Sequence, residues 1–372
     1  MRVFAILLSV LLAGCVGSVA AKNPHITPSP TASPTPTPTP TPSPTPPPLT
    51  HRVAVMLVNF SDDNRQPWTT DFISTLWNGP ARSVQDFYAR SSFGQENLSA
   101  DVFGWFTIAA PTTECGFWGT NSALADAVAT ASGVDLSQYT NRAYIVPFTS
   151  QCHFTGTGDN PGSRTWFNIN PATCTPADCS QQFQPFPHEI GHNFGLAHAH
   201  SLICTSGGVH VVLSDTCTTN EYGDQFNAMG CCQPSLLSNV DRLKLGYIPA
   251  PQMVTITASG TYTITGAYSA ASSVFRVADG TGQFLYFENR AQQSAYDPGS
   301  EGGVWPNGNL LIRRAPDLPG IIGASLLDGS PADNDSIPNA KGMPVGSSFS
   351  FGALTVTNVS WDGTNNVVQV TL

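Results

Sequence analysis

Basic residues are scarce in this chain of 372 residues. Lysine and arginine together number 15, aspartate and glutamate 25, and charged residues make up only 11% of the sequence. With a formal net charge of −10, the chain offers no basic face of the kind that binds nucleic acid. Beyond the N-terminal segment, no apolar run is long enough to cross a bilayer. We therefore expect no nucleic-acid partner and no membrane span in the rest of the chain.

The one long apolar run lies at the N-terminus. Met1-Arg2 precedes an apolar stretch from Val3 to Leu12, which is too short to span a bilayer and is typical of a secretory signal. Leu12-Ala13-Gly14-Cys15 matches a bacterial lipoprotein box, which predicts cleavage before Cys15 and diacylation of its sulfur. Ordinary cleavage after the small residues Ser18-Val19-Ala20-Ala21 is the alternative. We expect a signal segment over residues 1–21 and an extracellular or cell-surface protein, anchored by lipid at Cys15.

Residues 22–50 are dominated by Thr-Pro repeats. A segment of this composition cannot build a core and should lie extended as polyproline II. At ~3.1 Å per residue it would hold the next domain roughly 80 Å from a membrane. A tether with no role in recognition is enough to explain it. The membrane contact that we expect is therefore confined to the N-terminal lipid.

The most informative segment runs from His188 to His198 and has the pattern H-E-x-x-H-x-x-G-x-x-H. On a helix, His188 and His192 share one face and can bind one Zn²⁺. Glu189 lies beside them, where it can take a proton from a zinc-bound water. Gly195 permits positive φ, so the chain can turn back and present His198 as third ligand. Three protein ligands leave the fourth position open, which favours a catalytic over a structural zinc.

Two neighbouring features refine this site. Pro187 suits the first position of a helix, so we expect the zinc-binding helix to start there. Downstream, Asn227-Ala228-Met229-Gly230 places a Met before a Gly that permits a tight turn. In the metzincin class a methionine turn follows the third His and lies under the zinc-binding imidazoles. We therefore assign Met229 to such a turn rather than to core filling.

With this zinc motif and this Met turn, the chain resembles the gametolysin family of metzincin peptidases. The segment ending in Leu245-Gly246-Tyr247 is similar to the family, as are Ser83 to Tyr88 and Ser91 to Gly94. The resemblance covers about residues 51–248. It implies a zinc endopeptidase in which an edge strand of the sheet pairs with extended substrate, and we place that edge strand at Arg164 to Ile169.

Nine cysteines occur, and eight remain after Cys15 is set aside: Cys115, Cys152, Cys174, Cys179, Cys204, Cys217, Cys231 and Cys232. An even number in an exported chain predicts up to four disulfides. The connectivity cannot be deduced from sequence alone. Proximity along the chain suggests Cys115–Cys152 and Cys174–Cys179, with Cys204 and Cys217 bridging to Cys231 and Cys232.

The predicted fold class is α+β, with a metzincin-like catalytic domain of mixed sheet and helices over residues 51–248. It begins with a buried strand at His51 to Phe60 and a helix over Trp68 to Ala89, and loops fill residues 200–232. From residue 249 to residue 372, short strands alternate with Gly, Asn, Asp and Pro turns. This spacing predicts an all-β, sandwich-like C-terminal domain.

The residues thus predict a monomeric zinc endopeptidase, secreted or tethered to the cell surface, that acts on a protein or peptide. Two alternatives stay open. One is a surface binding or adhesion protein with an inactive, structural zinc, which would leave Glu189 without a role. The other is a zinc amidase acting on cell-wall peptide, which a substrate-binding edge strand disfavours.

Overall fold

The computed structural model describes residues 49–230, 235–266, 272–290, 296, 308–318, 323–333 and 341–372. Pro46 to Leu372 form one compact unit. The predicted signal segment, Cys15 and almost all of the predicted tether lie outside the described residues, as do Cys231 and Cys232. Among the helices that can be described, none is both long and apolar enough to cross a membrane.

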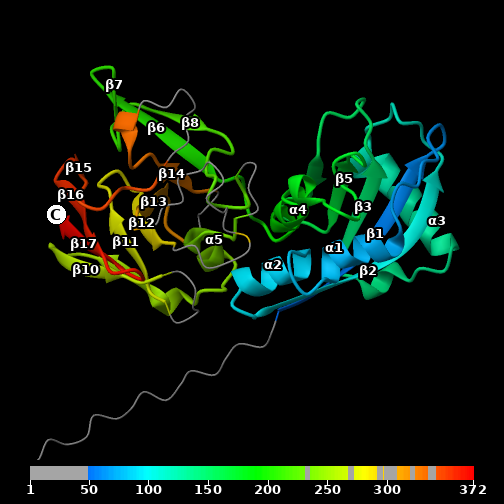
Figure 1. The fold of residues 1–372 in the computed structure, drawn as a ribbon, viewed down its shortest axis with the longest axis horizontal. Coiled ribbons are helices and arrows are strands. Elements are labelled where there is room, and N and C mark those ends of the chain that lie inside the picture. Colours follow the sequence, from blue (N-terminus) through cyan, green and yellow to red (C-terminus); the bar gives the residue numbers. More distant parts are fainter. Residues whose placement is uncertain are drawn as a thin grey trace, which may run out of the picture. The chain divides into compact units, whose positions relative to one another are not determined.

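A mixed sheet organises residues 49–230, all of which are described. Its strands are β1 (Leu49–Phe60), β2 (Glu96–Ile108), β3 (Asn141–Pro147), β4 (Gly156–Gly158) and β5 (Arg164–Ile169), in the order β2-β1-β3-β5-β4 (Figure 1). Neighbours in β2-β1-β3-β5 are parallel, and β4 adds antiparallel to β5 at the edge. The prediction that Arg164 to Ile169 is the edge strand is therefore wrong. The true edge, Gly-Thr-Gly, is too short and glycine-rich to read as a strand.

Helices cover both faces of this sheet, which explains why β1 reads as a continuous apolar run. Alternate residues of β1 point to opposite faces. Val53, Val55 and Leu57 belong to the same core as α1 (Thr70–Asn78), α2 (Val84–Ser91) and α4 (Pro185–Asn193). Ala54, Met56 and Val58 pack instead with α3 (Ser122–Ala131).

The single helix predicted over Trp68 to Ala89 is in fact two helices. α1 ends at Asn78; its C-cap is Gly79, whose N–H donates to the Thr75 carbonyl at 2.9 Å, and Pro80 follows. The residue before a proline is disfavoured in the helical region, so the chain leaves the helix there. Ser83 then caps α2 by accepting from the Asp86 N–H at 3.1 Å.

The C-terminal part is a sandwich of two sheets. In the described ranges, one sheet has eight strands: β6 (His200–Ser206), β7 (Val209–Val211), β8 (Cys217–Asn220), β9 (Met253–Ile256), β11 (Val274–Ala278), β12 (Phe284–Asn289), β13 (Leu310–Ala315) and β14 (Ser325–Leu327). The other has four: β10 (Gly260–Ile264), β15 (Ser348–Phe351), β16 (Leu354–Trp361) and β17 (Asn366–Thr371). Leu285, Phe287 and Ile312 of the first sheet share a core with Val356, Val368 and Val370 of the second. The predicted fold class, α+β followed by a β-sandwich, is confirmed.

Hydrogen-bonded strands cross the predicted domain boundary. β6, which directly follows the zinc motif, pairs in parallel with β14, with His200 opposite Ser325. Residues 200–232 therefore contain three strands where the sequence suggested loops. Cys and Gly interrupt the apolar pattern of these strands, so the sequence does not indicate them. They form because β6 pairs with β14, β7 and β8. The boundary at residue 248 stays a prediction. It falls within the eight-stranded sheet, whose strands β6, β7 and β8 precede residue 248.

Three disulfides lie in the described part of the chain: Cys115–Cys152, Cys174–Cys179 and Cys204–Cys217. The first two are the bonds that chain proximity predicts. The bridges predicted from Cys204 and Cys217 to Cys231 and Cys232 are wrong. Cys204 lies directly opposite Cys217 in the antiparallel β6–β8 pair, with their Cα atoms 4.0 Å apart. Because the two sulfurs are bonded to each other, neither cysteine can pair with Cys231 or Cys232.

Candidate metal centre and active site

Helix α4 carries the first half of the zinc motif. It begins at Pro185, two residues before the predicted start at Pro187, with Gln184 as its N-cap. Both prolines fall in the first turn, where a missing N–H leaves no intrahelical bond unmade. Phe186 and Ile190 anchor the helix in the core. The hydroxyl of Tyr88, on α2, donates to the Pro187 carbonyl at 2.7 Å.

Gly195 ends the helix as the sequence predicts, with φ at +91°. Its N–H donates to the His192 carbonyl at 2.8 Å, and the Leu196 N–H donates to the Gly191 carbonyl at 2.9 Å. This pair of bonds is the Schellman motif, which satisfies the last carbonyls of a helix and reverses the chain. The reversal brings His198 back toward α4.

The structure brings all three predicted histidines together. One ring nitrogen from each of His188, His192 and His198 lies within 4.8 Å of the others. His188 and His192 are buried, whereas the side chain of His198 is one-quarter exposed. The site is therefore covered on the helix side and reachable from solvent on the side of the third histidine.

The other nitrogen of each ring is held by an acceptor. The Nδ1 contacts are His188 to the Ala228 carbonyl at 2.8 Å, His192 to the Leu196 carbonyl at 2.7 Å, and His198 to Glu221 Oε1 at 2.8 Å. An acceptor at Nδ1 keeps the proton there and leaves the Nε2 lone pair free for a metal. Burial lowers the pKa of His192. Burial also lowers the pKa of His188, and together with the nearby His192 ring it brings that pKa to about 3. Both rings are thus neutral, as metal binding requires.

Two amides support these acceptors. Gln184 Nε2 donates to the carbonyls of Ala228 at 2.7 Å and Gly230 at 3.0 Å. Asn160 Nδ2 donates to the Leu196 carbonyl at 2.8 Å. Each amide binds the very carbonyl that orients a histidine, so it fixes that carbonyl's position. Three imidazoles so oriented form a donor set that suits Zn²⁺.

Met229 lies against the turn of α4 that carries the histidines. It is fully buried, and a Cβ added at Gly191 would lie 2.5 Å from its sulfur. The turn is closed by the Gly230 N–H, which donates to the Asn227 carbonyl at 2.9 Å. The Met229 carbonyl accepts from the Ala199 N–H at 2.8 Å. The turn therefore contacts both the helix and the residue after His198.

Glu189 points into the site beside the histidines. It is 6% exposed, and its Oε2 has no hydrogen-bond partner among the described residues. Burial raises its pKa to about 8. The edge strand β4 packs on it so closely that a Cβ at Gly156 would lie 2.6 Å from Glu189 Oε1. The carboxylate is thus held in a protein-lined slot, and its buried Oε2 is left without a hydrogen-bond partner among the described residues.

These groups line an open cleft of about 630 Å³. Its walls include β4, the histidines, Glu189 and Tyr222. Tyr222 adopts φ of +61°, rare for a residue with a side chain, and its ring centroid is 4.0 Å from that of His198. Sequence reasoning missed Glu221 and Tyr222, because neither belongs to a motif. It also missed Asn160 and Gln184, which only the fold brings to the rings.

Comparison with known proteins bears on this geometry. The sequence profile described as Gametolysin peptidase M11 matches residues 52–274, and no curated protein matches the chain. Among solved structures, the chain is similar to wild-type OgpA from Akkermansia muciniphila at 14% identity and a TM-score of 0.37, over 64% of this chain and 71% of that one. A chaperone-substrate complex is similar at 14% identity and a TM-score of 0.22, over 40% and 24%. Neither structural likeness is strong enough to carry an argument. The profile spans more than half of the chain and includes the three converging histidines, so the protein belongs to the gametolysin family of metallopeptidases.

Proposed function

We propose that the protein is a zinc endopeptidase in which His188, His192 and His198 hold the metal and Glu189 is the general base. One observation carries this proposal. Three imidazoles, each with Nδ1 held by an acceptor, converge in an open cleft beside a buried carboxylate, one oxygen of which has no partner in the part of the chain that is described. A structural zinc site has no use for that carboxylate, and burying it without a partner carries a free-energy cost.

The chemistry divides between metal and protein. Bound Zn²⁺ supplies a Lewis acid that polarises a carbonyl and makes water more acidic. Glu189 takes the proton of the attacking water on its carboxylate and then delivers it to the leaving amine. The slot formed by β4 holds the carboxylate in one position, which keeps both proton transfers within reach. The carbonyls of Ala228 and Leu196 and the carboxylate of Glu221 keep the imidazoles oriented throughout.

The cleft suits an extended peptide. β4 lies at the edge of its sheet, with β5 on one side only, so its outer backbone groups are available to pair with another strand. Residues of β4 also line the cleft, so a peptide paired there passes Glu189. We therefore propose a protein or peptide substrate, a monomeric enzyme and no nucleic-acid partner. The location we propose is the cell exterior, with a lipid on Cys15 as the membrane contact.

The first prediction concerns the metal. Mature protein purified from its host should contain about one Zn²⁺ per chain, because three imidazoles with an acceptor at each Nδ1 form a preorganised site. Elemental analysis measures this content. Cleavage of an unbiased peptide library should stop with a chelator and return when zinc is added. Active protein that contains no zinc would refute the proposal.

The second prediction separates base from ligands. Glu189→Gln should keep its zinc and lose about 10²–10⁴-fold in kcat, because the proton acceptor is gone while the ligands remain. His198→Ala should lose zinc and activity together. Zinc content and single-turnover rates measured on both variants distinguish the two effects. Near-normal turnover by Glu189→Gln would revive the hypothesis of an inactive site with another role.

The third prediction tests the slot around Glu189. Gly156→Ala should lower kcat about 10–100-fold with zinc content unchanged, because the new methyl displaces the carboxylate. Gly104→Ala on β2 is the matched control, since a Cβ there meets nothing within 4 Å. Equal kcat values for the two variants would show that Glu189 needs no such positioning.

The fourth prediction concerns the anchor. If the lipoprotein box is used, the mature chain should begin at a diacylated Cys15 and fractionate with membranes. Cutting the tether should then release soluble, active enzyme. Intact-mass analysis of the mature chain decides the matter. A mature N-terminus near Lys22 without lipid mass would mean a freely secreted enzyme.

A further inference from the structure

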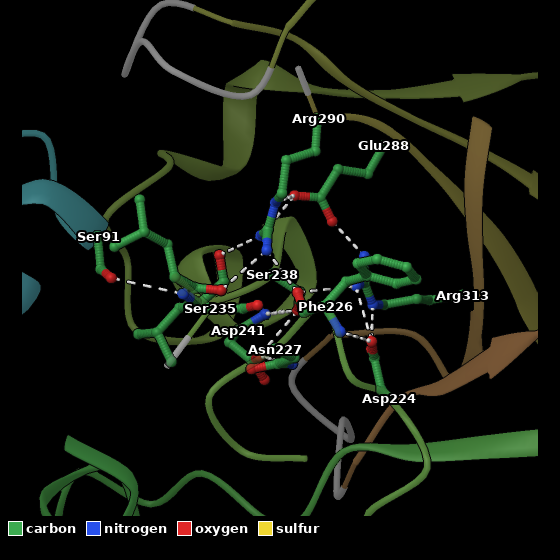
Figure 2. A network of polar contacts seen from close by, with 12 residues as sticks. Ser91, Asp224, Phe226, Asn227, Ser235, Ser238, Asp241, Glu288, Arg290 and Arg313 are labelled. Carbon is green, nitrogen blue, oxygen red and sulfur yellow. Dashed lines mark hydrogen bonds and ion pairs between the residues drawn. The ribbon is translucent and has the colours of Figure 1, made fainter. Parts of the chain in front are cut away.

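Two arginines and two carboxylates lie buried together beside the Met turn. We call Asp224, Glu288, Arg290 and Arg313 the buried charge cluster (Figure 2). Arg313 Nε lies 2.6 Å from Asp224 Oδ2, and Arg290 Nη2 lies 2.9 Å from Glu288 Oε1. A further ion pair joins Arg313 to Glu288. All four side chains are at most 2% exposed.

The cluster joins parts of the chain that are far apart in sequence. Glu288 lies on β12, Arg290 directly follows that strand, and Arg313 lies on β13. Asp224 instead belongs to the segment that leads into the Met turn. Residues of the C-terminal sheet are therefore paired, deep inside the molecule, with a segment of the metal centre.

Beyond the charge pairs, the guanidinium groups bind backbone carbonyls on both sides of the Met turn. Phe226, immediately before the turn, accepts from Arg290 Nη1 and from Arg313 Nη2, the latter at 3.3 Å. Beyond the turn, Arg290 donates to the carbonyls of Leu236 at 3.1 Å and Leu237 at 2.9 Å. An arginine fork can bind several acceptors in fixed geometry, and no apolar residue could replace it here.

From this segment the contacts continue to the histidines. The Asp224 N–H donates to the Ala199 carbonyl at 3.3 Å, and the Ala199 N–H donates to the Met229 carbonyl. Ala199 directly follows His198. Within the turn itself, the Ala228 carbonyl accepts from His188 Nδ1. A displacement of residues 224–230 would therefore reach the first and third predicted ligands.

The energetics favour a role in positioning over one in stability. Taking ions out of water carries a large free-energy cost, and proteins with apolar replacements of buried ion pairs are often as stable. Burial raises the pKa of Glu288, but the charges of Arg290 and Arg313 outweigh burial and hold that pKa below its usual value. Glu288 thus stays charged beside the two arginines, whose guanidinium groups donate to the carbonyls of the Met-turn segment.

We infer that the buried charge cluster positions the metal centre. Arg313 and Arg290 hold the segment around the Met turn, and through it the Ala228 carbonyl that orients His188 and the chain that carries His198. The C-terminal sheet is then part of the catalytic apparatus, although none of the four cluster residues is among those that line the cleft. This inference rests on the proposed zinc site.

The test compares two neighbouring arginines of β13 in the full chain. Arg313→Lys keeps the buried charge but loses the fork that joins Asp224, Glu288 and Phe226. Arg314→Lys is the matched control, because Arg314 pairs with Asp279 at 2.7 Å and donates to Thr281 Oγ1 at 2.7 Å, and neither partner belongs to the cluster. We first measure the thermal midpoint of each variant. At a temperature below both midpoints we then measure the zinc dissociation constant, by competition with a chelator, and kcat and KM.

Arg313→Lys should weaken zinc binding about 10–100-fold, the usual effect of losing a group that supports a ligand, and lower kcat with little change in KM. Arg314→Lys should bind zinc as the parent does, whatever its thermal midpoint. If Arg313→Lys fails to fold, Asp224→Asn replaces it, since the amide oxygen can still accept from the Phe226 N–H. A folded cluster variant with parental zinc affinity and kcat would overturn the inference. A parent chain that binds no zinc would instead refute the proposed function.

Discussion

A metal site built from histidines works only if each imidazole is neutral and presents the correct nitrogen. Here the orientation of the three rings is set at Nδ1, where two backbone carbonyls and Glu221 accept hydrogen bonds. Each acceptor must in turn be held in place. Gln184 and Asn160 do so for the two carbonyls, so the arrangement of the histidines depends on a layer of polar contacts behind them.

Much of the remaining fold serves that layer. The Schellman turn at Gly195 supplies the Leu196 carbonyl, and the Met turn supplies the Ala228 carbonyl. The Met turn packs on Gly191 and is flanked by carbonyls that bind Arg290 and Arg313 from the C-terminal sheet. β6, which leaves the motif after His198, is itself a strand of that sheet. The peptidase part and the sandwich therefore share contacts at the segment that matters most for the histidines.

The sequence predicted what local spacing determines. The relative positions of His188, Glu189 and His192 follow from helical geometry alone. The turn that returns His198 to them follows from the freedom of Gly195 to adopt positive φ, so one short motif was enough to predict the group. Strand and disulfide pairing between residues far apart in the chain could not be predicted in this way. The Gly-Thr-Gly edge strand, the Cys204–Cys217 bond and the strands after residue 200 exist because of partners far along the chain or across a sheet. Tyr222 and Arg313 belong to no motif, and only the fold places them near the site.

X-ray absorption at the zinc edge tests the central claim most directly, because it reports the metal's neighbours without relying on activity. For the purified full chain, the account predicts that three imidazole nitrogens lie about 2.0–2.1 Å from the zinc and that one oxygen ligand lies about 2.0–2.2 Å from it. The Glu189→Gln variant should give the same three-imidazole shell. A sulfur ligand at about 2.3 Å, or a shell closed by a fourth protein side chain, would contradict the account.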